Sequence, residues 1–207
     1  DHYLKWFTTI PMWLDLGELR VVHACWHDES IALVEQHCGS STPFADVEHL
    51  VAASTSGDPL YDAVETLLKG PEISLVEHGQ GPYHDKAGHS RDNARLQWWN
   101  SSGRTLRGLA EMGGNFTTAS GQPYPALPDL EVPAGERSYV YSAQIPVFYG
   151  HYWRQGRPEH GHDWTDYTAC VDFSAVKGGT LTAYRWSGEE QINPDHYFPR
   201  PNTGRDG

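Results

Sequence analysis

Two histidines follow short runs of β-branched and aromatic residues that have the composition of strands. His23 comes directly after the run 19–22, and His151 comes after the run 146–149 and one glycine. Because α/β folds gather their chemistry where strands leave a sheet, we expect both imidazoles to lie at such a strand end. The alternative is that both are ordinary strand-end histidines, hydrogen-bonded to the backbone.

Arg95 and Lys69 are the candidate phosphate-binding cations. Arg95 lies in a stretch that contains Trp98 and Trp99, and its guanidinium can hold a phosphate through two parallel hydrogen bonds. Lys69, beside a Gly-Pro pair, is the second candidate. Exposed salt bridges are the commoner use of both side chains, and this alternative remains open for each.

Three aromatic residues flank the histidines. Trp26 stands three residues after the first histidine, and Tyr152 and Trp153 stand directly after the second. Their rings can stack on a base or on an aromatic leaving group, although packing in the core is the commoner role. Farther along, Asp172 either orients a ligand histidine from behind or is a turn or surface carboxylate.

The composition limits the classes of partner. The 207 residues are enough for one domain, and nothing in the sequence requires a second. No apolar run approaches the roughly 18 residues of a membrane span, and no signal-peptide pattern is found, so we expect a cytoplasmic protein. Three widely spaced cysteines indicate neither a disulfide framework nor a cysteine zinc site. The net charge of −12 argues against nucleic-acid polymers and membranes as partners, and an anionic substrate would need a metal or a local Arg or Lys.

The rest of the chain supplies elements that can position these residues. We predict helices over 27–38 and 60–68, strands over 19–24, 138–143 and 146–149, and two consecutive strands over 167–173 and 181–186. A glycine turn at 177–179 joins the last two strands. Residues 189–207 contain three prolines and are predicted to be an extended tail, ordered weakly or by docking.

Three segments in this order resemble a known family. The sequence RVVHACW at 20–26 resembles the "strand, VHAG" element of calcineurin-like metallophosphoesterases, with Cys25 where glycine is usual. VFYGH at 147–151 resembles their later "strand, GH" element, and the residues from 169 to 183 are similar to their closing pair of strands. The chain therefore resembles the branch that contains phosphoprotein phosphatases and bis(5′-nucleosyl)-tetraphosphatases, over roughly residues 3–188.

The resemblance implies an α/β fold, an αββα sandwich of which residues 1–188 form the C-terminal part of a single domain. The Asp-x-His, Gly-Asp-x-x-Asp-Arg and Gly-Asn-His elements of the family do not occur in this sequence. They carry most of the family's metal ligands and its proton-donating histidine, so no catalytic residue is assigned within this chain. His23 and His151 are the implied ligands of one of two divalent ions, Mn, Fe, Zn or Ni.

The function implied is hydrolysis of a phosphomonoester or phosphoanhydride. The substrate would be a phosphorylated small molecule, a dinucleoside polyphosphate or a phosphoprotein. If the parent chain is longer, we expect a phosphatase; if these 207 residues are the whole protein, we expect it to be inactive. No serine-hydrolase elbow, P-loop or dinucleotide fingerprint is found in the sequence.

Two rival interpretations remain open. The first is a noncatalytic binding or scaffold module that kept the fold and lost the site. The second is a secreted, histidine-rich β protein that holds zinc through His160 and His162.

Overall fold

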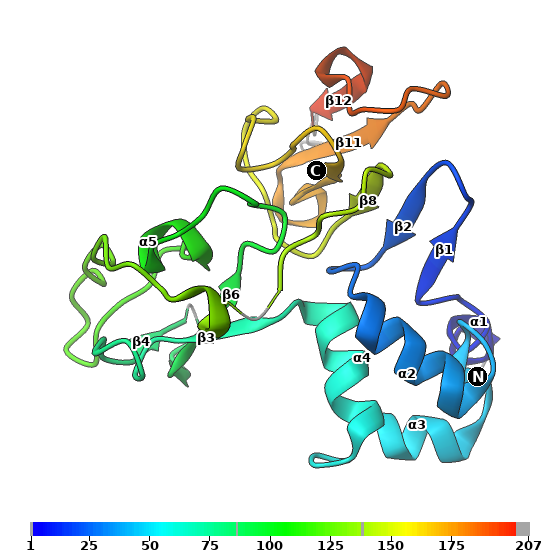
Figure 1. The fold of residues 1–207 in the computed structure, drawn as a ribbon, viewed down its shortest axis with the longest axis horizontal. Helices are drawn as coiled ribbons and strands as arrows, with labels where there is room; N and C mark the ends of the chain where they lie inside the picture. The colour runs from blue at the N-terminus through cyan, green and yellow to red at the C-terminus, as the bar shows by residue number, and fades with distance from the viewer. Residues whose placement is uncertain (1, 86, 138, 202–207) are drawn as a thin grey trace, which may run out of the picture. The chain divides into compact units, whose positions relative to one another are not determined.

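The structure, a computed structural model, describes residues 2–85, 87–137 and 139–201 and has a mixed α/β fold with several small sheets (Figure 1). The chain divides into two units. The first unit consists of Asp1–Lys69 and Ala143–Gly207, and the second is Gly70–Ser142. The sequence patterns did not predict this division.

The first unit contains a four-stranded sheet in the order β1-β2-β8-β9. Its strands are β1 (Trp13–Asp15), β2 (Arg20–Val22), β8 (Val147–Tyr149) and β9 (Thr168–Cys170). β1 runs antiparallel to β2, whereas β2, β8 and β9 run parallel. Because parallel neighbours end at the same edge of a sheet, the residues after β2 and β8 leave the sheet together.

A second, antiparallel sheet of the same unit is formed by β10 (Asp172–Phe173), β11 (Thr180–Tyr184) and β12 (Tyr197–Pro201). Phe148 and Ala169 of the first sheet share a buried core with Phe173 and Tyr197 of the second. All three residues of β8 and of β9 are buried, so both faces of the first sheet are covered at these strands.

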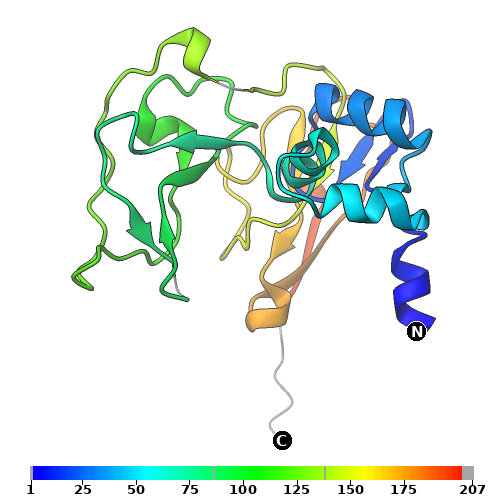
Figure 2. The same ribbon diagram turned by 90° about the horizontal axis from the view of Figure 1, so that it is seen from below.

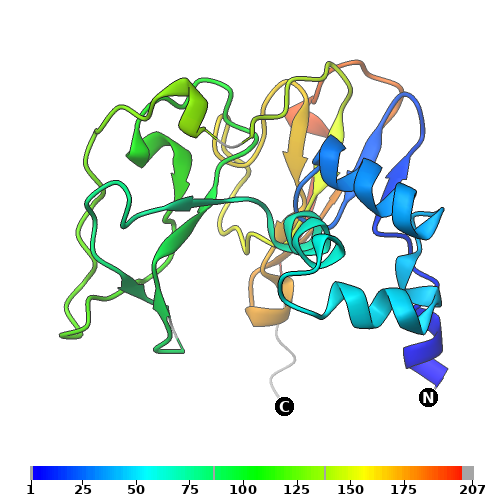
Figure 3. The same cartoon turned by 60° about the horizontal axis from the view of Figure 1, so that its bottom comes forward.

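Helices lie beside β2 in Figures 1 and 3: α2 (Asp28–Cys38), α3 (Val47–Ala53) and α4 (Pro59–Lys69). α4 begins at a proline, and its apolar residues recur at helical spacing, which buries Leu60, Val64 and Leu67. α2 ends at Gly39, whose left-handed backbone accommodates the cap. The short 3-10 turn η1 (Pro43–Ala45) connects α2 to α3. Near the N-terminus, α1 (His2–Phe7) has no buried residue.

The second unit has its own core and its own small sheets, drawn mostly in green in Figure 2. Its elements are β3 (Glu72–Ser74), β4 (Tyr83–His84), β5 (Ser90–Arg91), β6 (Asn93–Leu96), α5 (Leu106–Leu109), β7 (Ala110–Glu111) and η2 (Ala134–Glu136). β3, β6 and β7 form one antiparallel sheet, and β4 pairs with β5 in a hairpin.

Two predicted strands differ from the structure. The segment 167–173 is divided between two sheets, because β9 pairs with β8 whereas β10 turns to pair with β11. Residues 139–143 are not in a strand, and Ser138 lies outside the described residues. The remaining predicted elements are present with ends shifted by up to a few residues.

The predicted tail 189–207 is ordered by docking where the structure describes it. After the 3-10 turn η4 (Pro194–His196), β12 pairs with β11 over five residues, and Ile192 and Tyr197 are buried. Residues 202–207 lie outside the described part. Among the described helices, none is long and apolar enough to cross a membrane.

Candidate functional site

His23 and His151 come together at the edge where β2 and β8 end. Their ring centroids are 5.4 Å apart, with 60° between the ring planes. The two strands are parallel neighbours, and the N–H of Gly150 donates to the carbonyl of His23 at 2.9 Å. This backbone hydrogen bond extends the pairing of β2 and β8 by one step and places the two imidazoles side by side.

The backbone turns sharply directly after β8. His151 has φ = 74° and Trp153 has φ = 53°, a left-handed conformation that is uncommon for residues with a side chain. Such backbone costs free energy and persists where surrounding contacts hold it. Gly150, just before the turn, has little space: an added Cβ would lie 3.3 Å from the Cβ of Asp172.

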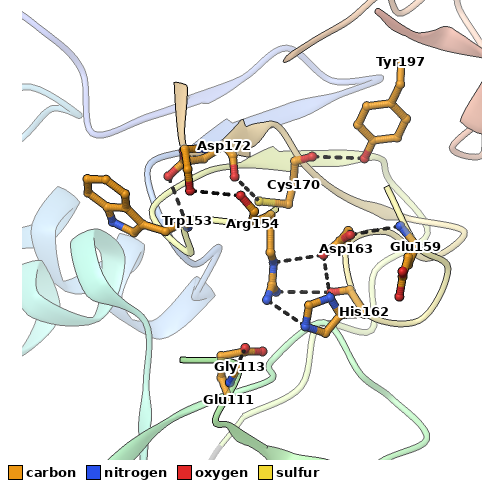
Figure 4. Close-up of polar contacts among 11 residues, drawn as sticks. Glu111, Gly113, Trp153, Arg154, Glu159, His162, Asp163, Cys170, Asp172 and Tyr197 are labelled. Carbon is orange, nitrogen blue, oxygen red and sulfur yellow. Dashed lines mark hydrogen bonds and ion pairs between the residues drawn. The ribbon is translucent and has the colours of Figure 1, made fainter. Parts of the chain in front are cut away.

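Asp172 holds this turn in place (Figure 4). One carboxylate oxygen accepts the N–H of Trp153 at 3.4 Å, and the other accepts the N–H of Ser174 at 3.1 Å. Ser174 also has a left-handed backbone, with φ = 59°. These hydrogen bonds are those of a turn carboxylate, one of the two roles considered for Asp172, and the orientation of a ligand histidine by Asp172 stays a prediction.

The charge of Asp172 also acts on His23. The protein around the imidazole lowers the pKa of His23 by desolvation, and the carboxylate of Asp172 partly opposes this by raising it. The side chain of His23 is nevertheless exposed. The lowered pKa favours neutral imidazole, the form that binds metals.

The segment after His23 is fixed on the end of α4. The N–H groups of Ala24 and Cys25 both lie within hydrogen-bond distance of the carbonyl of Leu67, at 3.1 and 3.4 Å. Cys25 is fully buried, and burial raises the pKa of its thiol well above the ordinary value. A buried thiol with a raised pKa has little of the reactive thiolate form.

Trp26 packs in the core and does not line the site. It is 2% exposed, its indole N–H donates to Asp28 at 2.9 Å, and the guanidinium of Arg20 lies 4.6 Å from its ring. Both faces of a ring this deeply buried are covered, so the predicted stacking on a substrate is wrong for Trp26. The alternative, packing in the core, is what the structure shows.

Tyr152 is half-buried next to His151. Their ring centroids are 5.8 Å apart in a T-shaped arrangement, and the guanidinium of Arg154 lies 5.3 Å from the Tyr152 ring. A role of Tyr152 in substrate binding stays a prediction.

The two predicted cations are both engaged in ion pairs. The ammonium of Lys69 lies 2.6 Å from Glu65, one turn earlier in α4. The guanidinium of Arg95 lies 3.0 Å from Glu72 and donates to the carbonyl of Gly70, all within the second unit. Because each cation has a carboxylate partner, the salt-bridge alternative describes both of them as the structure shows them.

The His160–His162 loop contains a buried ion pair that the sequence patterns did not reveal. Arg154 and Asp163 are both buried, 3.2 Å apart. Asp163 also lies 2.6 Å from Nδ1 of His162, and Arg154 contacts Nε2 of the same ring at 3.1 Å (Figure 4). Both ring nitrogens of His162 therefore have protein partners, and the ring of His160 packs against Trp164. This loop is held by internal contacts and does not present two free imidazoles for zinc.

The separation of the two imidazoles can be compared with that of two histidines that share one metal ion. Two imidazoles that share an ion at metal–nitrogen distances of about 2.1 Å have ring centroids roughly 5 Å apart, close to the separation in this structure. Within the described residues, no group of three or more His, Cys, Asp or Glu side chains is placed to hold a metal. Two imidazoles are fewer than the four ligands of an ordinary protein zinc site, so metal binding by this pair stays a prediction.

A scan against protein-family models, a search of curated proteins and a search of solved structures each returned no match for this chain.

Proposed function

We propose that this chain is the C-terminal part of a calcineurin-like metallophosphoesterase whose parent protein hydrolyses a phosphomonoester or a phosphoanhydride. The observation that carries the proposal is the meeting of His23 and His151 at the ends of adjacent parallel strands. The two motifs that contain them lie far apart in the sequence. The pairing of β2 with β8 brings the two positions together, and a histidine at both of them is what one shared metal site requires.

The arrangement of the first unit supports the same proposal. Helices lie beside a mostly parallel sheet, which packs in turn on a second, antiparallel sheet. These layers are compatible with part of an αββα sandwich. A cavity of about 310 Å³ lies between the sheets, lined by apolar residues that include Val21 and Phe148 from the first sheet and Ala183 and Trp186 from β11 and beyond.

The residues of this chain have distinct roles in the proposed reaction. His23 and His151 would hold one divalent ion as neutral imidazoles, and Asp172 fixes the backbone turn that orients His151. The bound metal would supply Lewis-acid polarisation of a phosphoryl oxygen. The overall reaction adds water to phosphorus, breaks the bond to the leaving oxygen and transfers a proton to that oxygen. We assign the proton transfers to the preceding segment, where the missing motifs would stand.

Metal content and phosphatase activity of the parent protein test the proposal. The double variant His23→Ala and His151→Ala should lose most of the bound metal, and His151→Ala alone should reduce p-nitrophenyl phosphate turnover by roughly 100-fold or more. His37→Ala, an exposed position on α2, is the matched control and should leave both quantities unchanged. Unchanged turnover in His151→Ala would refute the proposal.

A noncatalytic module on the same fold is the second candidate. It is favoured by the finding that, within the described residues, the histidine pair gains no third metal ligand. The sequence encoded upstream of Asp1 separates the two candidates. The phosphatase requires the Asp-x-His, Gly-Asp-x-x-Asp-Arg and Gly-Asn-His elements there, within about one ordinary domain length.

A further inference from the structure

An exposed indole with an ammonium group above it lies two residues after His151 in the chain. Trp153 follows His151 by two residues, and its side chain is 44% exposed. The ammonium nitrogen of Lys177 lies 3.9 Å from the centroid of the Trp153 ring, the geometry of a cation–π contact. Lys177 ends the short 3-10 turn η3 (Ala175–Lys177) and is itself exposed.

Four hydrogen bonds fix the two segments that carry these side chains. The Asp172 carboxylate accepts the N–H groups of Trp153 and Ser174, and its carbonyl accepts the N–H of Arg154 at 3.0 Å (Figure 4). The buried hydroxyl of Ser174 donates to the carbonyl of Arg154 at 3.0 Å. The strained backbone of Trp153 and Ser174 is thus held from both sides, so the position of the indole is determined by the framework.

Asp172 also connects this pair to the candidate metal ligands. The same carboxylate that binds the N–H of Trp153 acts electrostatically on His23. One carboxylate therefore holds the backbone at Trp153 and at Ser174, three residues before Lys177. Aromatic faces and cations beside a phosphate site are suited to an ester whose leaving group is an aromatic ring.

The charged group of Lys177 has a different partner from those of the two cations considered above. Lys69 and Arg95 each have a carboxylate partner within 3.0 Å. Among the described residues, Lys177 makes no such ion pair, and its ammonium is instead held on the indole. A phosphate dianion is a stronger partner for an ammonium group than an aromatic ring is, so it would draw Lys177 away and expose the indole face for stacking.

We propose that Trp153 and Lys177 form a binding site for phosphate esters of aromatic groups, with the ammonium on the phosphate and the indole on the aromatic ring. The site rests on the proposed function, for which it defines the substrate class. Phenyl phosphate is the simplest ligand that contains both parts.

Binding to the chain without metal tests the site directly. In EDTA and at low salt, titration followed by NMR should show phenyl phosphate binding more tightly than inorganic phosphate by about fivefold to tenfold, the value of one aromatic stack. Trp153→Ala should remove this difference, and Trp153→Phe should keep most of it. Lys177→Met should weaken both ligands by about fivefold. Val176→Ala, on the same turn and 91% exposed, is the control and should change neither.

Two results would overturn the inference. The first is an equal affinity of the unaltered chain for phenyl phosphate and inorganic phosphate. The second is a preference for phenyl phosphate that survives in Trp153→Ala while the variant keeps the melting temperature of the parent.

Hydrolysis by the parent protein separates this inference from the proposed function. If both hold, Trp153→Ala should lower kcat/KM for p-nitrophenyl phosphate by about fivefold to tenfold and leave an alkyl phosphate nearly unaffected. Equal losses for both substrates would refute the aromatic site and leave the phosphatase standing. Selective phenyl phosphate binding without any hydrolysis would refute the phosphatase and leave the binding site standing.

Discussion

Two opposing effects act on the pKa of the His23 imidazole, and removing one of them should shift that pKa in a known direction. Desolvation lowers its pKa, whereas Asp172 raises it. Asp172→Asn removes the charge and keeps an oxygen that can accept a backbone N–H. We therefore expect the pKa of His23 to fall further in this variant, measured by NMR titration of the imidazole protons.

Asp166→Asn is the matched control, because Asp166 is an exposed aspartate of the same unit. Asp166→Asn should leave the pKa of His23 unchanged. A rise in the His23 pKa after Asp172→Asn would contradict the electrostatic role assigned to Asp172.

The two tryptophans that follow the histidines differ in burial, so their replacement should change the free energy of unfolding by different amounts. Trp26 is 2% exposed and Trp153 is 44% exposed. Trp26→Ala should lower the free energy of unfolding by about 3–5 kcal/mol, because it leaves a large cavity. Trp153→Ala should cost about 1 kcal/mol or less, the value of an exposed cation–π contact. Denaturant unfolding of both variants checks the contrast, and equal losses would show that the two burial states are assigned incorrectly.

The turn between β10 and β11 depends on Gly179. A Cβ at this position would collide with the carbonyl oxygen of Phe173 and with the backbone of Ser174. These are backbone atoms and cannot move aside as a flexible side chain would. Gly179→Ala should therefore destabilise the first unit by roughly 1–3 kcal/mol, measured by thermal or denaturant unfolding.

Gly81→Ala serves as the comparison, since no atom lies within 4 Å of the added Cβ and its backbone is not left-handed. It should stay within about 0.5 kcal/mol of the parent. If Gly179→Ala were equally neutral, the turn would not have the close approach described.

The connection between β11 and β12 is organised by Glu189. Its carboxylate accepts hydrogen bonds from the Tyr184 hydroxyl, the Ser187 N–H and the His196 ring at 2.7–2.9 Å. Desolvation alone would raise its pKa, but these hydrogen bonds outweigh it and lower the pKa to about 2 from 4.5. Three separate positions of the connection are thereby joined to one side chain.

The lowered pKa of Glu189 predicts a pH dependence of stability. The unfolded chain binds a proton near pH 4.5 and the folded chain only near pH 2, so the carboxylate stabilises the fold above pH 4.5. This contribution is lost as the pH falls through that window. The slope of unfolding free energy against pH reports how many more protons the unfolded chain binds than the folded chain. In Glu189→Gln, this difference between pH 4.5 and 2 should decrease by up to one proton. Urea unfolding at several pH values measures it, and an unchanged slope would contradict the hydrogen-bonded carboxylate.

The molecule as a whole consists of two units, each with a core of its own. The first unit contains both histidines, Asp172, Trp153 and Lys177, and it is formed from segments at the two ends of the sequence. The second unit is one continuous segment and includes Arg95. The proposed chemistry is therefore assigned to the first unit alone.

Several parts of the first unit could be predicted from local sequence. The runs before His23 and His151 form strands, the apolar spacing of α4 forms a helix, and the glycines after Lys177 form a turn. These elements depend on residues close together in the chain. Strand composition, helical periodicity and glycine backbone freedom are all local properties, so sequence patterns alone determine them.

The partners and burial of those elements were decided only by tertiary structure. The segment 167–173 has strand composition throughout, yet it serves two sheets because its neighbours are β8 on one side and β11 on the other. Trp26 and Trp153 both follow a histidine, yet Trp26 is 2% exposed and Trp153 is 44% exposed. The contact of Lys177 with Trp153 likewise joins segments that have no common sequence pattern. Pairing and burial depend on surfaces contributed by distant residues, and short-range composition does not contain that information.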